Sequence, residues 1–286
     1  MESKAVDPAE FRDTQRESWN GAARGWKKWS GWLDGYTTVV SERLVELAGV
    51  EPGSRVLDVA AGYGEPALTA AGKAGPDGTV VATDISSEML AYGRERAAAA
   101  GLDNVEFIES DASALDFPAE SFDAALSRWG IIFEPDGEEA ASRVRGFLKP
   151  GARMAISSWG SPERVPMIGR PMRTAMDRLG VPPPPPGTPG PLSRPTPEAI
   201  GGLLAGGGFS DVQVEELDLT FEWSSPEEFS VYTKDIVAPI TRMVEAHPED
   251  VQEETWRAIA DDIRDESDDG GTVRLTNQVL LAVGQA

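Results

Sequence analysis

The chain has 286 residues, of which 40% are hydrophobic, and its 48 acidic and 26 basic residues give a formal net charge of −22. This length allows one large domain or a core with a helical cap. Because such an acidic surface repels nucleic-acid phosphates, we expect neither DNA nor RNA as a partner. No apolar run reaches the roughly 18 residues of a membrane span. Met1-Glu2-Ser3-Lys4 does not resemble a signal peptide.

The chain contains no cysteine, which excludes disulfides, thiolate metal sites and cysteine nucleophiles. We therefore expect a cytoplasmic protein without a bound metal. The acid excess suits either an ordinary acidic protein or one from a salt-rich cytoplasm, where a highly charged surface stays soluble. Composition leaves the oligomeric state open between a monomer and a homodimer.

Two helices are expected in an N-terminal lid at residues 1–50. Asp7-Pro8-Ala9-Glu10 is typical of a helix start, and a second helix is expected at about 37–49. Half of the chain's eight tryptophans lie in this region: Trp19, Trp26, Trp29 and Trp32. Their rings either pack the helix onto the core or form an aromatic face that closes over a cationic ligand. Both alternatives stay open.

Residues 55–67 have the pattern of a strand, a small-residue turn and a helix. The apolar run of Val56, Leu57 and Val59 predicts a strand buried on both faces. Gly62 and Gly64 permit a turn against which a ligand can lie directly. Asp58 lies inside this strand, where it can hold the turn through backbone N–H groups.

A second apolar run, Thr79-Val80-Val81-Ala82-Thr83, ends in Asp84, twenty residues after Gly64. A carboxylate at the end of a neighbouring strand can accept hydrogen bonds from both hydroxyls of a ribose. The two segments together therefore predict a binding site for a cofactor that contains a nucleoside.

Strands and helices alternate through a core at residues 51–160. The expected strands are 55–59, 79–83, 104–108, 122–127 and 152–158, and the expected helices are 65–74, 86–100 and 137–148. Five strands joined by helical crossovers predict an α/β fold with a doubly wound, mostly parallel sheet.

The pattern changes after residue 160. Residues 182–197 hold nine of the 22 prolines, and we expect 161–210 to form a Pro-rich insertion followed by a helix at 196–206. An alternating strand at 211–221 and a last strand within 273–283 can pair antiparallel. They complete seven strands in a terminal unit at 211–286, with a helical cap insertion at 224–270.

The turn sequence Gly62-Tyr63-Gly64-Glu65-Pro66-Ala67 fits the dinucleotide pattern G-x-G-x-x-A, so an NAD(P)-dependent oxidoreductase remains an alternative. Three features argue against it. Asp58 replaces the usual apolar residue, no second mononucleotide-binding half follows, and Asp111-Ala112 follows the third strand, where an acid can meet an adenine amino group.

Taken together, these segments resemble the class I S-adenosylmethionine-dependent methyltransferases, in particular their ubiquinone/menaquinone C-methyltransferase-like branch. The segments that carry the resemblance are Val56 to Gly64, Thr83 to Leu90, Ser110 to Pro118, Phe122 to Ser127, and Leu148-Lys149-Pro150-Gly151. They occur in the family's order over about 50–160, and the terminal strand pair has the expected place. Ala60 departs from the glycine that many members carry.

The resemblance implies S-adenosyl-L-methionine as cofactor, with S-adenosyl-L-homocysteine as product. It assigns Ala60, Ala61, Gly62 and Gly64 to the methionine part, Asp84 to the ribose, and Ile85 and Met89 to the two sides of the adenine. It assigns Asp111 and Ala112 to the polar edge of the adenine, Ser127 to the cofactor, and Trp129 to the neighbourhood of the methyl group. Trp29 joins this cofactor-binding set from the N-terminal lid.

The implied reaction moves a methyl group to a small or medium, apolar or aromatic acceptor by in-line displacement. Alignment and exclusion of water supply most of its rate, so no dedicated catalytic residue is assigned. His247, Glu134 and Arg128 are the candidate titratable groups. The residues expected to form either the acceptor pocket or ordinary cap core are Trp159, Met167, Ile168, Met172, Met176, Phe229, Tyr232, Ile236 and Met243. A non-catalytic nucleoside-binding or sensor module of the same fold is the alternative function.

Overall fold

The computed structural model of the chain describes residues 8–185 and 187–286, which contain a seven-stranded sheet flanked by helices. The strands are β1 (Arg55–Val59), β2 (Thr79–Asp84), β3 (Val105–Glu109), β4 (Phe122–Arg128), β5 (Leu148–Trp159), β6 (Ser210–Trp223) and β7 (Val273–Gln285). Their order is β3-β2-β1-β4-β5-β7-β6. Only the pairs that involve β7 are antiparallel, which confirms the predicted mostly parallel sheet with an antiparallel last strand.

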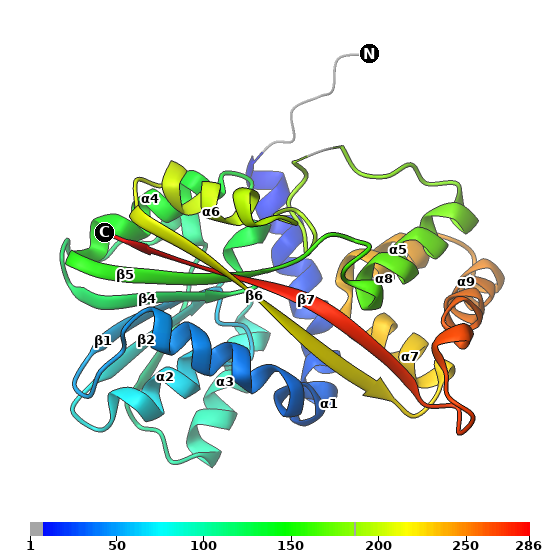
Figure 1. The fold of residues 1–286 in the computed structure, drawn as a ribbon, viewed down its shortest axis with the longest axis horizontal. Coiled ribbons are helices and arrows are strands. Elements are labelled where there is room, and N and C mark those ends of the chain that lie inside the picture. The colour runs from blue at the N-terminus through cyan, green and yellow to red at the C-terminus, as the bar shows by residue number, and fades with distance from the viewer. Residues whose placement is uncertain (1–7, 186) are drawn as a thin grey trace.

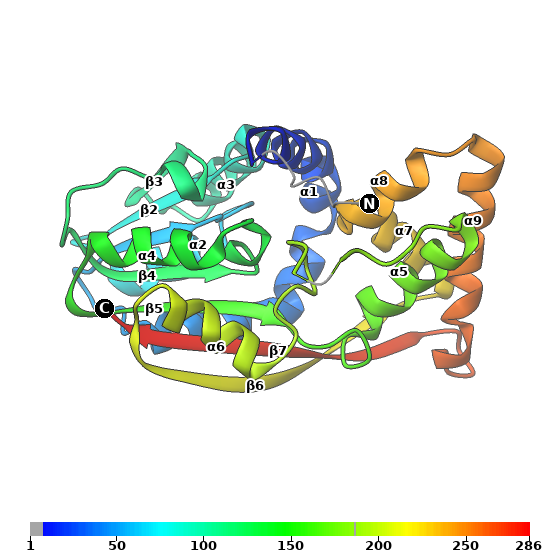
Figure 2. The same cartoon turned by 90° about the horizontal axis from the view of Figure 1, so that it is seen from above.

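Helices cover both faces of the sheet (Figure 2). The helices of the core are α2 (Ala67–Ala74), α3 (Ser87–Ala99), α4 (Gly137–Phe147) and α6 (Pro197–Gly206). Neighbouring residues of β1 point to opposite faces: Val56 joins an apolar cluster with α2, while Leu57 joins one with α4 and α6. Because both residues are fully buried, β1 is the predicted central strand without a solvent face.

The N-terminal region forms a single helix, α1 (Pro8–Leu47), so the expectation of two helices was wrong. The Thr37 and Thr38 hydroxyls donate to the carbonyls of Leu33 and Asp34 across the expected break. Gly35 lies there, and one glycine costs only about 1 kcal/mol in a helix interior, which contacts with α3 and with the cap helix α7 (Pro226–Ile236) can offset. Asp7, the expected N-cap, lies outside the described residues.

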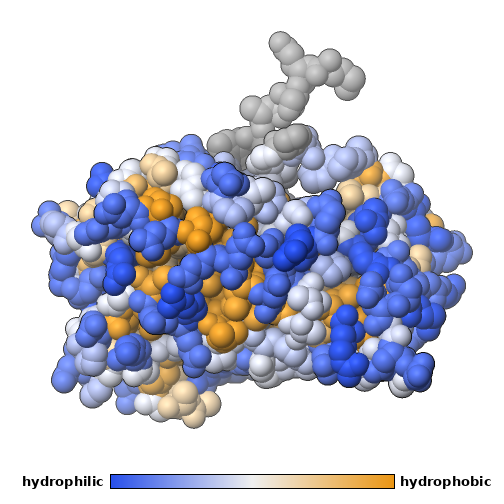
Figure 3. Space-filling model, in the orientation of Figure 1, coloured by the Kyte–Doolittle hydropathy of each residue, from blue (hydrophilic) through white to orange (hydrophobic). Residues whose placement is uncertain are grey.

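A helical cap lies beyond the end of the parallel strands, and the long strands β6 and β7 reach from the core into it (Figure 1). Besides α7 it contains α5 (Pro166–Leu179), α8 (Ala238–Glu245) and α9 (Glu249–Asp262). Helix α5 was not expected from the sequence, whose prolines suggested an irregular insertion. Arg170 of α5 pairs with Asp262 and Asp265 at 3.0 and 2.8 Å, which ties α5 to the C-terminal end of α9 and the residues that follow it. In Figure 3, which has the orientation of Figure 1, hydrophilic side chains dominate the surface of the cap at the right.

Candidate functional site

One cavity gathers most of the predicted site residues at the carboxyl ends of the parallel strands. It contains about 1480 Å³ of empty space, part of it open to solvent. It lies where β1 and β4 are neighbours in the sheet, which is where the strand order reverses and α/β proteins bind ligands.

The glycine turn after β1 forms the floor of one half of the cavity, which we call the nucleoside half. Ala60 has a left-handed φ of +57°, which explains why a glycine is common at this position. A Cβ on Gly130 would lie 2.5 Å from the Cβ of Ala60, so the glycine at 130 accommodates the alanine at 60. The turn therefore retains its left-handed conformation with alanine at residue 60.

Asp84 at the end of β2 connects the two strands at this floor. Its Oδ2 accepts the Gly62 N–H at 2.8 Å, and its Oδ1 accepts the Ser86 N–H at 2.8 Å. Burial raises the pKa of Asp84 to about 6 against the lowering effect of these donors. The carboxylate is 8% exposed and lines the cavity, so it can still receive hydroxyl donors from a ligand.

Asp58 does not hold the turn in the expected way. Gly62 donates to Asp84 and Gly64 donates to the Ala61 carbonyl at 2.9 Å, so neither glycine of the turn is held by Asp58, whose nearest backbone donor is the Ala67 N–H at the start of α2. Complete burial raises its pKa well above the usual range. The Arg128 charge and the Ala67 N–H act against this rise, so Asp58 is a buried carboxyl group behind the site.

The far end of the nucleoside half carries two carboxyl groups. Asp111 follows β3 and accepts the Ser113 N–H at 2.8 Å, with the Arg12 guanidinium of α1 at 3.9 Å from its other oxygen. Burial raises the pKa of Glu134 to about 7, and the charge of Asp111 adds to this effect. Arg12 partly opposes the rise, so α1 supplies the positive charge at this end of the cavity.

The other half of the cavity is lined mainly by apolar and aromatic side chains, and we call it the aromatic half. They come from α1, the ends of β4, β5 and β6, and the cap: Leu33, Trp129, Trp159, Met167, Ile168, Phe221, Tyr232, Ile236, Val237, Ala238 and Pro239. Trp129 and Trp159 stack in parallel, with centroids 4.4 Å apart. Trp129 has a φ of +52°, unusual for a bulky residue, and such strain concentrates at functional sites.

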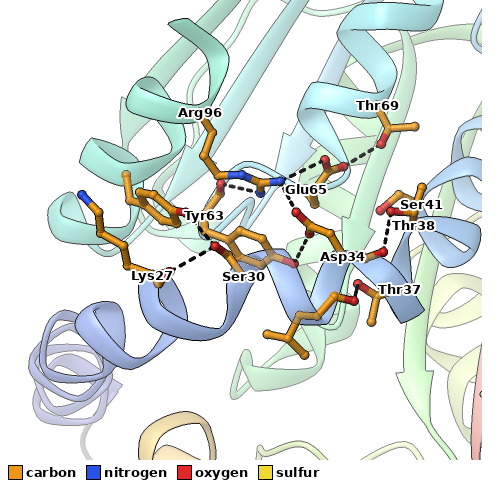
Figure 4. Close-up of polar contacts among 12 residues, drawn as sticks. Lys27, Ser30, Asp34, Thr37, Thr38, Ser41, Tyr63, Glu65, Thr69 and Arg96 are labelled. Carbon is orange, nitrogen blue, oxygen red and sulfur yellow. Dashed lines mark hydrogen bonds and ion pairs between the residues drawn. The ribbon is translucent and has the colours of Figure 1, made fainter. Parts of the chain in front are cut away.

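A polar network lies under α1 beside the glycine turn (Figure 4). Arg96 of α3 contacts Asp34 at 2.5 Å and Glu65 at 3.7 Å, and the Tyr63 hydroxyl donates to Asp34 at 3.1 Å. Nearby, the hydroxyls of Ser30 and Tyr92 lie 2.6 Å apart, in a second contact between α1 and α3. These contacts hold α1 against the core where it covers the cavity.

Nine of the predicted cofactor-binding residues line the cavity, and they are Ala60, Ala61, Gly62, Asp84, Ile85, Met89, Asp111, Ala112 and Trp129. The remaining three do not line it. Trp29 donates from Nε1 to Asp235 at 2.8 Å and packs edge-on against Tyr232. A Cβ on Gly64 would meet Leu68 at 3.2 Å, so this glycine faces packed side chains. Ser127 is buried, with its hydroxyl bonded to the Val59 carbonyl at 2.8 Å.

The expected acceptor pocket is also divided. Trp159, Met167, Ile168, Tyr232 and Ile236 line the cavity, whereas Met172, Met176, Phe229 and Met243 do not. Phe229 is fully buried in the core. Of the three titratable candidates, Glu134 and Arg128 line the cavity and His247 does not.

The sequence reasoning missed several lining residues. Tyr63 lies between the two glycines of the turn, a position that could have suggested a role beside the ligand, and Phe133 follows the fourth strand closely. Arg12 and Gln15 of α1 carried no usable signal, because only the path of the helix brings them over the cavity. Among the described residues, no helix is long and apolar enough to cross a membrane, and no cluster of His, Asp or Glu forms a metal site.

Comparison with known proteins finds similar sequences for the core. Residues 56–151 match the family model described as a methyltransferase domain. An uncharacterized protein of Mycobacterium bovis is 42% identical over 116 residues, which span 41% of each chain. The ubiquinone/menaquinone biosynthesis C-methyltransferase UbiE of Ectopseudomonas mendocina is 39% identical over 119 residues, 41% of this chain and 46% of that one. The matches thus span less than half of these relatives, and they concern the core.

Solved structures share the fold over more of the chain. The YcgJ protein from Bacillus subtilis covers 86% of this chain, and 97% of its own length is matched, with a TM-score of 0.57 and 19% identity. A phosphoethanolamine N-methyltransferase 2 of Haemonchus contortus covers 98% of this chain with 60% of its own length, at a TM-score of 0.56 and 20% identity. The [4+2]-cyclase SpnF matches 86% of this chain and 79% of its own, with a TM-score of 0.52 and 19% identity. Residues 56–151 are therefore similar to a methyltransferase domain, and the chain shares its fold with these solved structures.

Proposed function

We propose that the chain binds S-adenosylmethionine in the nucleoside half and transfers its methyl group to a small or medium, apolar or aromatic acceptor in the aromatic half. The observation that carries the proposal is the position of the buried Asp84 carboxylate, which lines the same cavity as the turn at Ala60–Gly62 and the stacked Trp129–Trp159 pair. Support comes from the matched methyltransferase domain, from the C-methyltransferase name of the UbiE relatives, and from the S-adenosylhomocysteine bound to the Haemonchus contortus enzyme.

The residues present fit this cofactor. The small residues at 60–62 leave room for the methionine part beside the backbone, and Asp84 offers carboxylate oxygens to the ribose hydroxyls. Ile85 and Met89 suit the faces of the adenine, with Asp111 and Ala112 at its polar edge. Trp29, Gly64 and Ser127 would then support the site from behind, without touching the cofactor.

The bound cofactor would supply a methyl group already activated by its sulfonium. The chain would contribute orientation and the exclusion of water, since α1 covers the cavity and apolar and aromatic side chains line its aromatic half. An acceptor would form its new bond in line with the departing sulfur, which keeps the electron pair, and would release its own proton. We assign no catalytic base.

Two measurements test the proposal. Calorimetric titration should detect S-adenosylmethionine and S-adenosylhomocysteine at micromolar concentrations, and NAD should not compete. Radiolabelled methyl groups should then appear in at least one member of a panel of phenols, quinols, isoprenoids and lipids. Absence of heat with both compounds would refute the proposal.

A binding protein without turnover is the second candidate. The fold does not by itself require methyl transfer, because it is shared with a protein named as a [4+2]-cyclase. Tight binding of S-adenosylhomocysteine without labelling of any panel member would support that alternative.

A further inference from the structure

Arg128 is a buried guanidinium with only uncharged partners among the described residues. It ends β4, is 7% exposed and lines the cavity. Its Nη1 donates to the Thr37 and Ser41 hydroxyls at 3.1 and 3.0 Å, and its Nη2 donates to the Tyr63 hydroxyl at 2.8 Å. Burial raises the pKa of Tyr63, so this hydroxyl is neutral. Arg128 therefore faces the cavity without a directly bonded counter-ion in the described chain.

The neighbouring arginine shows the contrast. Arg96 is paired with Asp34 at 2.5 Å and lies 3.7 Å from Glu65, so two carboxylates neutralise it. Arg128 reaches Asp34 only through the Tyr63 hydroxyl. Burial of an unpaired charge is costly, and such groups are usually paired or placed where a ligand pairs with them. Glu65 and Asp34 act on Arg128 from farther away, so a bound anion would be the first counter-ion in direct contact with it among the described residues.

The geometry around Arg128 suits a planar anion. A guanidinium has more N–H donors than its bonds to Thr37, Ser41 and Tyr63 use, and none of the described hydrogen bonds involves its Nε. The rings of Tyr63 and Trp129 lie close by, with centroids 5.5 and 5.3 Å from its Cζ. These rings and hydroxyls restrict the orientation of the guanidinium, and an arginine held in this way matches the two oxygens of a carboxylate.

We propose that Arg128 forms a subsite for a carboxylate group of a ligand in this cavity. The inference rests on the proposed function, which offers two sources of this group. One is the amino-acid carboxylate of S-adenosylmethionine, and the other is a carboxylate on the methyl acceptor. The second source would make the acceptor an aromatic or other planar acid, because the adjacent Trp129 stacks on Trp159. In both cases Arg128 orients a reactant and takes no part in bond changes.

The test compares each acid with a neutral counterpart. Calorimetry measures S-adenosylhomocysteine against S-adenosyl-3-thiopropylamine, which lacks the carboxylate. It also measures 2-naphthoate against 2-naphthamide, with and without saturating S-adenosylhomocysteine. The proteins are the wild type, Arg128→Gln, Arg128→Lys and the control Arg96→Gln, which removes a partly buried charge of the same network that does not line the cavity. Thermal unfolding confirms that each variant is folded.

In Arg128→Gln, we expect the affinity for one of the two acids to fall at least about 10-fold, while its neutral counterpart changes less than twofold. The affected pair identifies the source of the carboxylate, and Arg128→Lys should lose less because it keeps the charge. Equal changes for acid and neutral ligands in both pairs would overturn the inference, as would an equal selective loss in Arg96→Gln. If the wild type does not bind S-adenosylhomocysteine, the proposed function fails, and the naphthoate pair still decides the role of Arg128.

Discussion

The two halves of the cavity are built in different ways. In the nucleoside half, short segments at the carboxyl ends of β1, β2 and β3 supply most of the predicted cofactor-binding residues, and the contacts use backbone groups and carboxylates. In the aromatic half, the lining comes from positions as far apart as Leu33 and Pro239, and the contacts are between rings and alkyl groups. Parallel strands bring their carboxyl ends together, so the first half follows from the sheet, whereas the second needs the cap and α1 as well.

For the proposed function, this difference predicts that donor binding and acceptor recognition are separable. A change in the nucleoside half should alter affinity for S-adenosylhomocysteine, and a change at the junction of α1 with the cap should alter the aromatic half alone. Each of the following variants is chosen to break one half and to leave the other intact.

The largest effect is expected from Asp84→Ala. The carboxylate at residue 84 accepts N–H bonds from both sides of the turn and faces the cavity, and hydrogen bonds to charged groups contribute about 1.5–3 kcal/mol. We expect the affinity for S-adenosylhomocysteine to fall about 100-fold, as measured by calorimetry. Asp218→Ala, an exposed aspartate paired with Arg164 at 3.4 Å, is the control and should stay within twofold. Unchanged affinity in Asp84→Ala would remove the ribose role from this residue.

Much of the fold and of the nucleoside half could be predicted because the signals were local. The run from Val56 to Val59 is buried on both faces, and a strand of this kind followed by a glycine turn allows few arrangements. Asp84 and Asp111 followed from the same rule for neighbouring strand ends. The wrongly placed side chains show that local sequence does not reveal which face of a helix meets the cavity. Trp29 lies one helical turn after Trp26, yet it bonds to Asp235 of α7, while Trp26 lines the cavity.

For the aromatic half, the sequence predicted apolar and aromatic residues but not which of them face the cavity. Met167 and Tyr232 line the cavity, but Met172 and Phe229, which have the same apolar character, pack elsewhere. Which apolar residue faces a cavity depends on how α5 and α7 are rotated against α1, and helix α5 was itself not expected. The single helix α1 was missed for a related reason, because its continuity at Gly35 depends on tertiary contacts with α3 and α7.

A smaller effect, confined to the aromatic half, is expected from Gly25→Ala. A Cβ at this position would lie 2.1 Å from the Asp235 carbonyl oxygen, which is backbone and cannot rotate away. Helix α7 must then shift from α1, and α7 carries Tyr232 and Ile236 into the cavity. Overpacking of this kind costs about 1–3 kcal/mol. We expect the free energy of unfolding in urea to fall by that amount, and the affinity for S-adenosylhomocysteine to stay within about threefold.

Gly21→Ala is the matched control on the same helix. No heavy atom lies within 4 Å of a Cβ at residue 21, so the alanine should raise the free energy of unfolding by about 0.5–1 kcal/mol through its better helix propensity. A loss of stability in both variants would mean that α1 tolerates alanine nowhere in this stretch, and the contact with α7 would no longer explain Gly25.

The smallest effect is a pH dependence restricted to the nucleoside half. Burial raises the pKa of Asp84 to about 6, and only the ionised carboxylate can accept from both ribose hydroxyls. The affinity for S-adenosylhomocysteine should therefore be constant above about pH 7 and fall about tenfold by pH 5, as protonation removes the acceptor. The pKa of Glu134 is also raised, to about 7, so Glu134→Gln separates the two groups and should keep the decline below pH 6. Asp84→Asn should bind weakly and without this pH dependence. If the fall in affinity persists in Asp84→Asn but disappears in Glu134→Gln, the pH dependence arises from Glu134 and not from Asp84.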